Sequence, residues 1–120
     1  MSRTRIARLF ERTRAERRAA FIAYLTAGDP TPDRTPALVE AMERGGADLI
    51  ELGVPFSDPL ADGPVIQRAA MRALEAGTTL AGVIEIARQI RTRSEIPLLL
   101  FTYLNPDRKS TRLNSSHVSQ

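Results

Sequence analysis

The chain has 120 residues, a formal net charge of +3 and 42% hydrophobic residues, which is the composition of a globular protein with a core. No apolar run approaches the roughly 20 residues that cross a bilayer, and the absence of cysteine excludes disulfide frameworks, thiolate nucleophiles and cysteine-ligated zinc. We expect a cytoplasmic location, with which that absence is compatible. The arginines crowd near the N-terminus without interleaved aromatic residues, so they indicate solvated helix faces rather than nucleic-acid binding.

The first part of the chain predicts a helix, a strand and a second helix. Apolar residues spaced i, i+3 and i+4 among arginines predict a short amphipathic helix over residues 3–14. The continuous apolar run over 19–25 predicts a strand that is covered on both faces, as in a parallel sheet. The next helix starts at 31–32 or 35–36, where a threonine precedes a proline, and it ends at the glycine pair 45–46.

The following part predicts strand, helix, helix and strand. A second strand is expected over 47–52, a loop over 53–63 and a helix over 64–77. A further helix over 80–90 precedes a third apolar strand over 96–102. The buried stripe of that further helix is expected to comprise Leu80, Val83, Ile84, Ala87 and Ile90. Strands that alternate with amphipathic helices are typical of α/β folds with a parallel sheet.

Residues 107–120 differ from the rest of the chain in composition. They contain the only lysine and the only histidine, whereas arginine is the sole cationic residue before them. We therefore expect one domain over 1–106 and a tail over 107–120 that does not belong to it. The tail resembles translated vector sequence fused to a truncated gene, and a native disordered tail is the alternative.

Two carboxylates stand out at the second strand and in the loop that follows it. Glu51 lies within an apolar run, where a charge is costly to bury without a partner. Strand alternation turns it away from Ile50 and Leu52, near the carboxyl end of the strand, where α/β folds build their active sites. Burial disfavours an ionised carboxylate, which suits a general acid–base. Asp62 follows in the loop, and two carboxylates in unlike environments can serve as proton shuttle and fixed anionic acceptor.

Both carboxylates also have structural explanations. Glu51 can be the partner of an interior arginine, and Asp62 can cap the helix that starts at Pro64. Spacing alone does not separate these explanations from catalysis.

Several other polar and aromatic residues lie at or near the expected strand ends. Asp58 and Asp29 are expected to be turn residues, because each lies beside a proline. Tyr24, Thr26 and Tyr103 are candidates for the lining of a pocket, and core packing is the alternative for Tyr24. No glycine-rich phosphate loop and no metal-binding pattern is present in the sequence.

The segment ELGVPFSDPLADGP over 51–64 is similar to the signature of the tryptophan synthase alpha chain family. The match is long and therefore specific. Shorter similarities support it at 26–30, 46–48, 66–67 and 103–106. The resemblance covers residues 1 to about 106 and does not extend into the tail.

The resemblance implies a TIM barrel, an α/β fold of which this chain supplies the first three parallel strands with their helices. It implies a lyase that cleaves indole-3-glycerol phosphate to indole and glyceraldehyde 3-phosphate in tryptophan biosynthesis. The indole passes to a beta chain in a heterotetramer of two alpha and two beta chains. No cofactor is expected on this chain, because the pyridoxal phosphate belongs to the beta chain.

The resemblance also assigns roles to particular residues by their position in the motifs. Glu51 is the acid–base that protonates indole C3 and handles the glycerol hydroxyl proton, and Asp62 accepts the indole N–H. Tyr24 and Tyr103 fall at substrate-binding positions. The expected contacts with the beta chain are Ser57, Asp58, Pro59 and Asn105.

The second half of a barrel has no counterpart in this sequence. A full barrel has about 250 residues, and the phosphate-binding loops of the family lie in the part without a match. We expect this fragment to be inactive and prone to aggregation, because three strands leave two unpaired edges. The alternatives are another phosphate-substrate TIM-barrel enzyme of tryptophan synthesis, or a non-catalytic fragment that retains only the beta-chain interaction loop.

Overall fold

The computed structural model describes residues 4–57 and 63–102, which form a three-stranded parallel sheet with helices. The order of elements along the chain is that predicted from the sequence, with one additional 3-10 turn. The elements are α1 (Arg5–Ala15), β1 (Ile22–Thr26), η1 (Pro32–Arg34), α2 (Thr35–Arg44), β2 (Leu49–Gly53), α3 (Pro64–Glu75), α4 (Leu80–Arg91) and β3 (Leu98–Phe101).

The strands lie in the order β1-β2-β3, and both pairs are parallel. The register places Glu51 of β2 between Tyr24 of β1 and Leu99 of β3. Two residues further on, Gly53 pairs with Thr26 on one side and with Phe101 on the other. Residues aligned in this way share a face of a sheet, so these two rows lie on one face.

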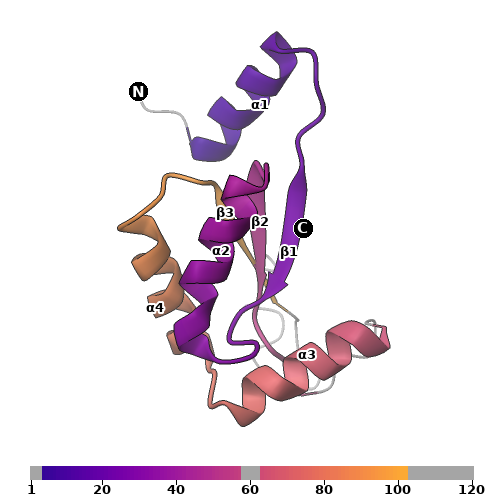
Figure 1. Cartoon of the computed structure of the whole chain (residues 1–120), viewed down its shortest axis with the longest axis vertical. Coiled ribbons are helices and arrows are strands. Elements are labelled where there is room, and N and C mark those ends of the chain that lie inside the picture. The colour runs from indigo at the N-terminus through magenta and orange to yellow at the C-terminus, as the bar shows by residue number, and fades with distance from the viewer. Residues whose placement is uncertain (1–3, 58–62, 103–120) are drawn as a thin grey trace, which may run out of the picture.

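The core lies on the opposite face of the sheet. Ile50 and Leu52 of β2 are completely buried there, under α2 and α4, which run side by side over that face (Figure 1). The helices contribute Val39, Val83, Ile86 and Ile90 to this core. The alternation expected for the second strand is therefore confirmed, with its aliphatic residues in the core and Glu51 on the other face.

The face that carries Glu51 is less covered than the sequence predicts. On the first strand, Ile22 and Tyr24 share the face of Glu51, and they are 46% and 36% exposed. The expectation that this strand is covered on both faces is wrong for the part of the chain that the structure describes. The reason is that α2 and α4 pack against one face only.

The helix boundaries follow local capping chemistry. Thr4 caps α1, because its hydroxyl accepts a hydrogen bond from the Ala7 N–H, at 3.0 Å. Both predicted starts of the second helix are used, since Pro32 opens η1 and Thr35 opens α2. In α4, Leu80 is 55% and Ile84 46% exposed, so the predicted stripe is wrong at both positions, and the buried residues are Val83, Ile86 and Ile90.

The helices α1 and α3 lie at opposite ends of the sheet. Figure 1 shows α1 beyond the amino ends of the strands and α3 beyond their carboxyl ends. Among the helices in residues 4–57 and 63–102, none has the length and apolar character needed to cross a membrane. The helix α3 therefore lies at the carboxyl edge of the sheet, where β2 ends two residues beyond Glu51.

Candidate active site

Glu51 lies in the middle of β2 and points away from the core. Its side chain is half-buried, and within residues 4–57 and 63–102 its carboxylate forms no hydrogen bond or ion pair. The structural alternative, in which an interior arginine pairs with Glu51, is therefore not found in the described part of the chain. A half-buried carboxylate without a partner among the described residues is available to contact a ligand.

Two aromatic rings meet beside Glu51, over Gly53. The rings of Tyr24 and Phe101 are 6.3 Å apart between centroids and nearly perpendicular, at 85°. Gly53 leaves room for this pair, because a Cβ atom at that position would lie 1.9 Å from the Tyr24 hydroxyl oxygen. The Thr26 hydroxyl donates a hydrogen bond of 3.3 Å to the same oxygen. The two outer strands thus supply an aromatic wall at the end of the central strand.

This arrangement suits a flat, apolar ligand that must gain or lose a proton. The edges and faces of aromatic rings favour perpendicular or offset contacts with a further ring. Tyr24 is therefore part of a surface that faces Glu51, rather than part of the core as the alternative had it. Phe101 was not predicted as a site residue. Strand alternation could have identified it, because Phe101 lies two positions beyond Leu99 and Leu99 pairs with Glu51, so both share the face of Glu51.

The turn after β1 is fixed to α3 by an ion pair. Asp29 accepts hydrogen bonds from the Arg72 guanidinium at 2.7 and 3.0 Å. The bond to Asp29 raises the pKa of Arg72 above its usual value. Asp29 therefore does more than form a turn, which is the role that the sequence predicted for it. It connects the carboxyl end of β1 to the last turn of α3.

Close packing around Gly28 also supports the same turn. Gly28 has a φ of +91°, and its N–H donates to the buried hydroxyl of Thr35 at 2.9 Å. A Cβ atom at Gly28 would lie 2.0 Å from the Thr78 hydroxyl oxygen. Thr78 is buried, and among the described residues its hydroxyl has no hydrogen-bond partner. The space next to Gly28 is thus completely used.

Several predicted site residues lie outside the described residues. They are Asp58, Pro59, Asp62, Tyr103 and Asn105. Ser57, the last described residue before the gap, is exposed. The N-cap of α3 is Gly63, and the alternative in which Asp62 helps to cap this helix concerns a residue outside the described ranges. In the described part of the chain, no group of three or more histidine, cysteine, aspartate or glutamate residues is placed to hold a metal ion.

Comparison with known proteins identifies a family and several relatives. The model of the family "Tryptophan synthase alpha chain" matches residues 10–111. The tryptophan synthase alpha chain of Solibacter usitatus is 77% identical over 103 residues, which are 86% of this chain and 39% of the relative. That of Rhizorhabdus wittichii is 55% identical over 104 residues and is covered to 38%. The chain thus spans about two fifths of the length of these relatives.

Solved structures show the same arrangement of elements. The alpha subunit of tryptophan synthase from Legionella pneumophila is similar with a TM-score of 0.84 and 44% identity, covering 88% of this chain and 40% of that one. The tryptophan synthase a2b2 complex from Pyrococcus furiosus contains a chain with a TM-score of 0.68 and 45% identity, covering 72% of this chain and 37% of that one. The three strands therefore keep in this chain the arrangement that they have in longer relatives.

Proposed function

The chain belongs to the tryptophan synthase alpha chain family, and on that premise we propose that it carries the proton-transfer residues of an indole-3-glycerol phosphate lyase. Its strands and helices form part of a TIM barrel. The reaction cleaves indole-3-glycerol phosphate to indole and glyceraldehyde 3-phosphate in tryptophan biosynthesis. The observation that carries this proposal is the half-buried, unpaired carboxylate of Glu51 next to the aromatic pair Tyr24 and Phe101.

The proposed mechanism uses Glu51 as both acid and base. Its protonated carboxyl group gives a proton to C3 of the indole ring, which weakens the bond from C3 to the glycerol side chain. The resulting carboxylate then takes the proton of the adjacent hydroxyl group. The bond between the carbon atoms breaks, its electrons return to the ring, and the hydroxyl carbon becomes the aldehyde. Glu51 ends in its starting protonation state, so the step is balanced.

The other proposed roles concern the charge and the orientation of the indole. Asp62 accepts the indole N–H and stabilises the positive charge that develops on the protonated ring. Tyr24 and Tyr103 bind the substrate, and Phe101 joins them because its ring packs against Tyr24. A ring held between these side chains has its C3 atom close to Glu51, which converts the proton transfer into a step between oriented groups.

The proposal is tested in a completed chimaera. In it, the residues of this chain replace the matched segment of the Solibacter usitatus relative, which supplies the remainder of the barrel. We expect the chimaera to release indole from indole-3-glycerol phosphate. Glu51→Gln keeps the shape of the side chain but cannot exchange a proton, so the rate falls on the order of 10²–10⁴-fold. Glu85→Gln on the surface of α4 is the matched control and leaves the rate unchanged. Equal rates for both variants would contradict the proposal.

We further propose a tryptophan synthase beta chain as partner and the cytoplasm as location. The similarity to a chain of the a2b2 complex from Pyrococcus furiosus supports the partner, and pyridoxal phosphate belongs to that beta chain. The proposed contacts are Ser57, Asp58, Pro59 and Asn105. Ser57→Arg should weaken the binding of the chimaera to the beta chain of Solibacter usitatus at least about tenfold in calorimetry, because a buried unpaired charge is costly at an interface. Thr92→Arg, on the exposed C-cap of α4, should leave the affinity unchanged.

A further inference from the structure

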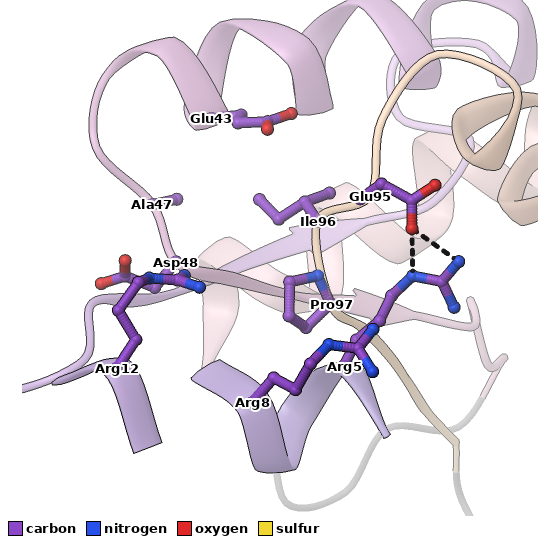
Figure 2. A pocket seen from close by; sticks show the side chains of 9 residues that line it. All are labelled: Arg5, Arg8, Arg12, Glu43, Ala47, Asp48, Glu95, Ile96 and Pro97. Atoms are coloured by element: carbon purple, nitrogen blue, oxygen red, sulfur yellow. Dashed lines mark hydrogen bonds and ion pairs between the residues drawn. The ribbon is translucent and has the colours of Figure 1, made fainter. Parts of the chain in front are cut away.

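A cavity of about 270 Å³ lies at the end of the sheet opposite to the carboxyl edge (Figure 2). One wall is α1, which contributes Arg5, Arg8 and Arg12. The other walls are Glu43 at the end of α2 and the segments that lead into β2 and β3. The cavity therefore lies at the amino ends of the strands, where neither Glu51 nor the aromatic pair is found.

The three arginines follow from the helical period of α1. Residues three and four positions apart share a face of a helix, so Arg5, Arg8 and Arg12 point to the same side. The residues of α1 that are buried are Leu9 and Thr13. Arg5 is held by Glu95, whose carboxylate lies 2.7 Å from its guanidinium, as the dashed lines in Figure 2 show. The positive charge of Arg5 is thus compensated within the cavity wall.

Arg12 is not compensated in this way. Asp48 also lines the cavity, and the charge of Arg12 acts on it electrostatically. The Asp48 carboxylate, however, already accepts two bonds from Arg18, at 2.9 and 3.1 Å, and one from the Phe21 N–H, at 2.8 Å. The bonds from Arg18, followed by the bond from the Phe21 N–H, hold the pKa of Asp48 below its usual range. Within the described residues, Arg12 has no hydrogen bond and no ion pair. Its guanidinium therefore presents donors to the cavity.

Glu43 is in the opposite situation. Its carboxylate accepts a hydrogen bond from the neutral Ser94 hydroxyl at 2.6 Å and forms no ion pair in the described part of the chain, while the charge of Arg91 acts on it electrostatically. Figure 2 shows Glu43 on the far side of the cavity from Arg8 and Arg12. Among the described residues, the cavity thus carries a guanidinium without a hydrogen bond on one wall and a carboxylate bonded only to a neutral hydroxyl on the other.

We propose that this cavity binds a small zwitterion, namely a free α-amino acid. The ligand carboxylate bonds to the Arg12 guanidinium, and the ligand ammonium group bonds to the Glu43 carboxylate. A simple anion would face Glu43 and a simple cation would face Arg12, so neither matches both walls. The volume lies just below the roughly 300–1,000 Å³ of pockets for drug-sized ligands, which suits a molecule as small as an amino acid.

The apolar part of the cavity fits the same class of ligand. Ala47, Ile96 and Pro97 line it and are themselves buried, so they form a rigid floor between the charged walls. A ligand held by Arg12 and Glu43 would connect α1 to α2. Binding should therefore slow the amide hydrogen exchange of α1, a readout that is independent of the lyase reaction.

The test is a titration of the completed chimaera, which retains every residue of the cavity wall, with glycine, followed by calorimetry and by the amide signals of Ala47 and Ile96 in NMR spectra. Acetate and methylammonium, which each carry one of the two charges, are the control ligands. We expect saturable binding of glycine and at least about tenfold weaker binding of either control ligand. Arg12→Gln and Glu43→Gln should each weaken glycine binding at least about tenfold, because each removes one charge-assisted hydrogen bond. Arg14→Gln, on the same helix but outside the cavity wall, should leave it unchanged.

Three results would overturn the proposal: no saturable binding of glycine, acetate binding as tightly as glycine, or equal effects of Arg12→Gln and Arg14→Gln. Arg12→Lys keeps the charge and should retain more affinity than Arg12→Gln, which separates loss of the contact from loss of the helix. Circular dichroism of each variant checks the helix directly.

Discussion

Gly53 is the residue that determines how the aromatic pair lies beside Glu51. The ring of Tyr24 covers the end of β2 at a distance that only a hydrogen atom in place of a side chain allows. The presence of a glycine after an apolar strand indicates a break, and the sequence predicts it as the start of a loop. What the sequence does not contain is the reason, because the close approach comes from Tyr24 on another strand.

Gly53→Ala tests the close contact between Tyr24 and Gly53. The added methyl group would overlap the Tyr24 hydroxyl, so the ring must move, and we expect a loss of about 1–3 kcal/mol in the free energy of unfolding. Urea denaturation of the completed chimaera measures it. Gly45→Ala is the control, since a methyl group there meets only ordinary contacts at 3.5 Å. When Tyr24 is first replaced by alanine, Gly53→Ala should lower the free energy of unfolding by less than it does in the presence of the tyrosine ring. An equal loss in both backgrounds would show that contact with Tyr24 is not the cause.

At the scale of elements, the turn after β1 is the joint that connects the sheet to α3. The sequence predicts the order of all strands and α-helices, because the apolar period and the proline and glycine signals are local. It does not predict that Asp29 reaches Arg72, or that Leu80 and Ile84 of α4 are exposed. Those features depend on which helix covers which face, and a periodic pattern contains no information about that choice.

A comparison of two glycines with nearly equal φ angles distinguishes the cost of steric overlap from the cost of a left-handed backbone at this turn. Gly28 has a φ of +91° and Gly77 a φ of +88°, but a methyl group meets Thr78 at Gly28 and open space at Gly77. Gly77→Ala should cost about 1 kcal/mol for the left-handed backbone alone. Gly28→Ala should cost about 1–3 kcal/mol more, because of the overlap. Equal losses in urea denaturation would show that the space next to Gly28 is not filled as described.

For the molecule as a whole, the uncovered face of the sheet is the dominant feature. Ile22 and Tyr24 of β1 are exposed on this face, and among the described strands β1 and β3 each have one edge without a neighbour. An apolar face beside free strand edges favours association with other chains. The chain also spans only about two fifths of its relatives, whose remaining length supplies the rest of the barrel.

We therefore predict that a polypeptide of residues 1–120 alone self-associates and does not release indole. Light scattering after size-exclusion chromatography should show species larger than the 13.2 kDa chain, and a dye that binds apolar surface should fluoresce strongly. The completed chimaera, in which the same face is covered, should be free of both effects. A monomeric 120-residue chain with lyase activity would contradict this prediction.

The most direct test of the assignment of Glu51 is the split between kcat and KM in the completed chimaera. Glu51→Gln removes the proton transfer but leaves the aromatic wall, so kcat for indole release should fall on the order of 10²–10⁴-fold with little change in KM. Phe101→Ala removes part of the wall but leaves the carboxylate, so its main effect should be a higher KM. If Glu51→Gln instead changed KM and left kcat near that of the unsubstituted chimaera, Glu51 would bind the substrate without taking part in the chemistry.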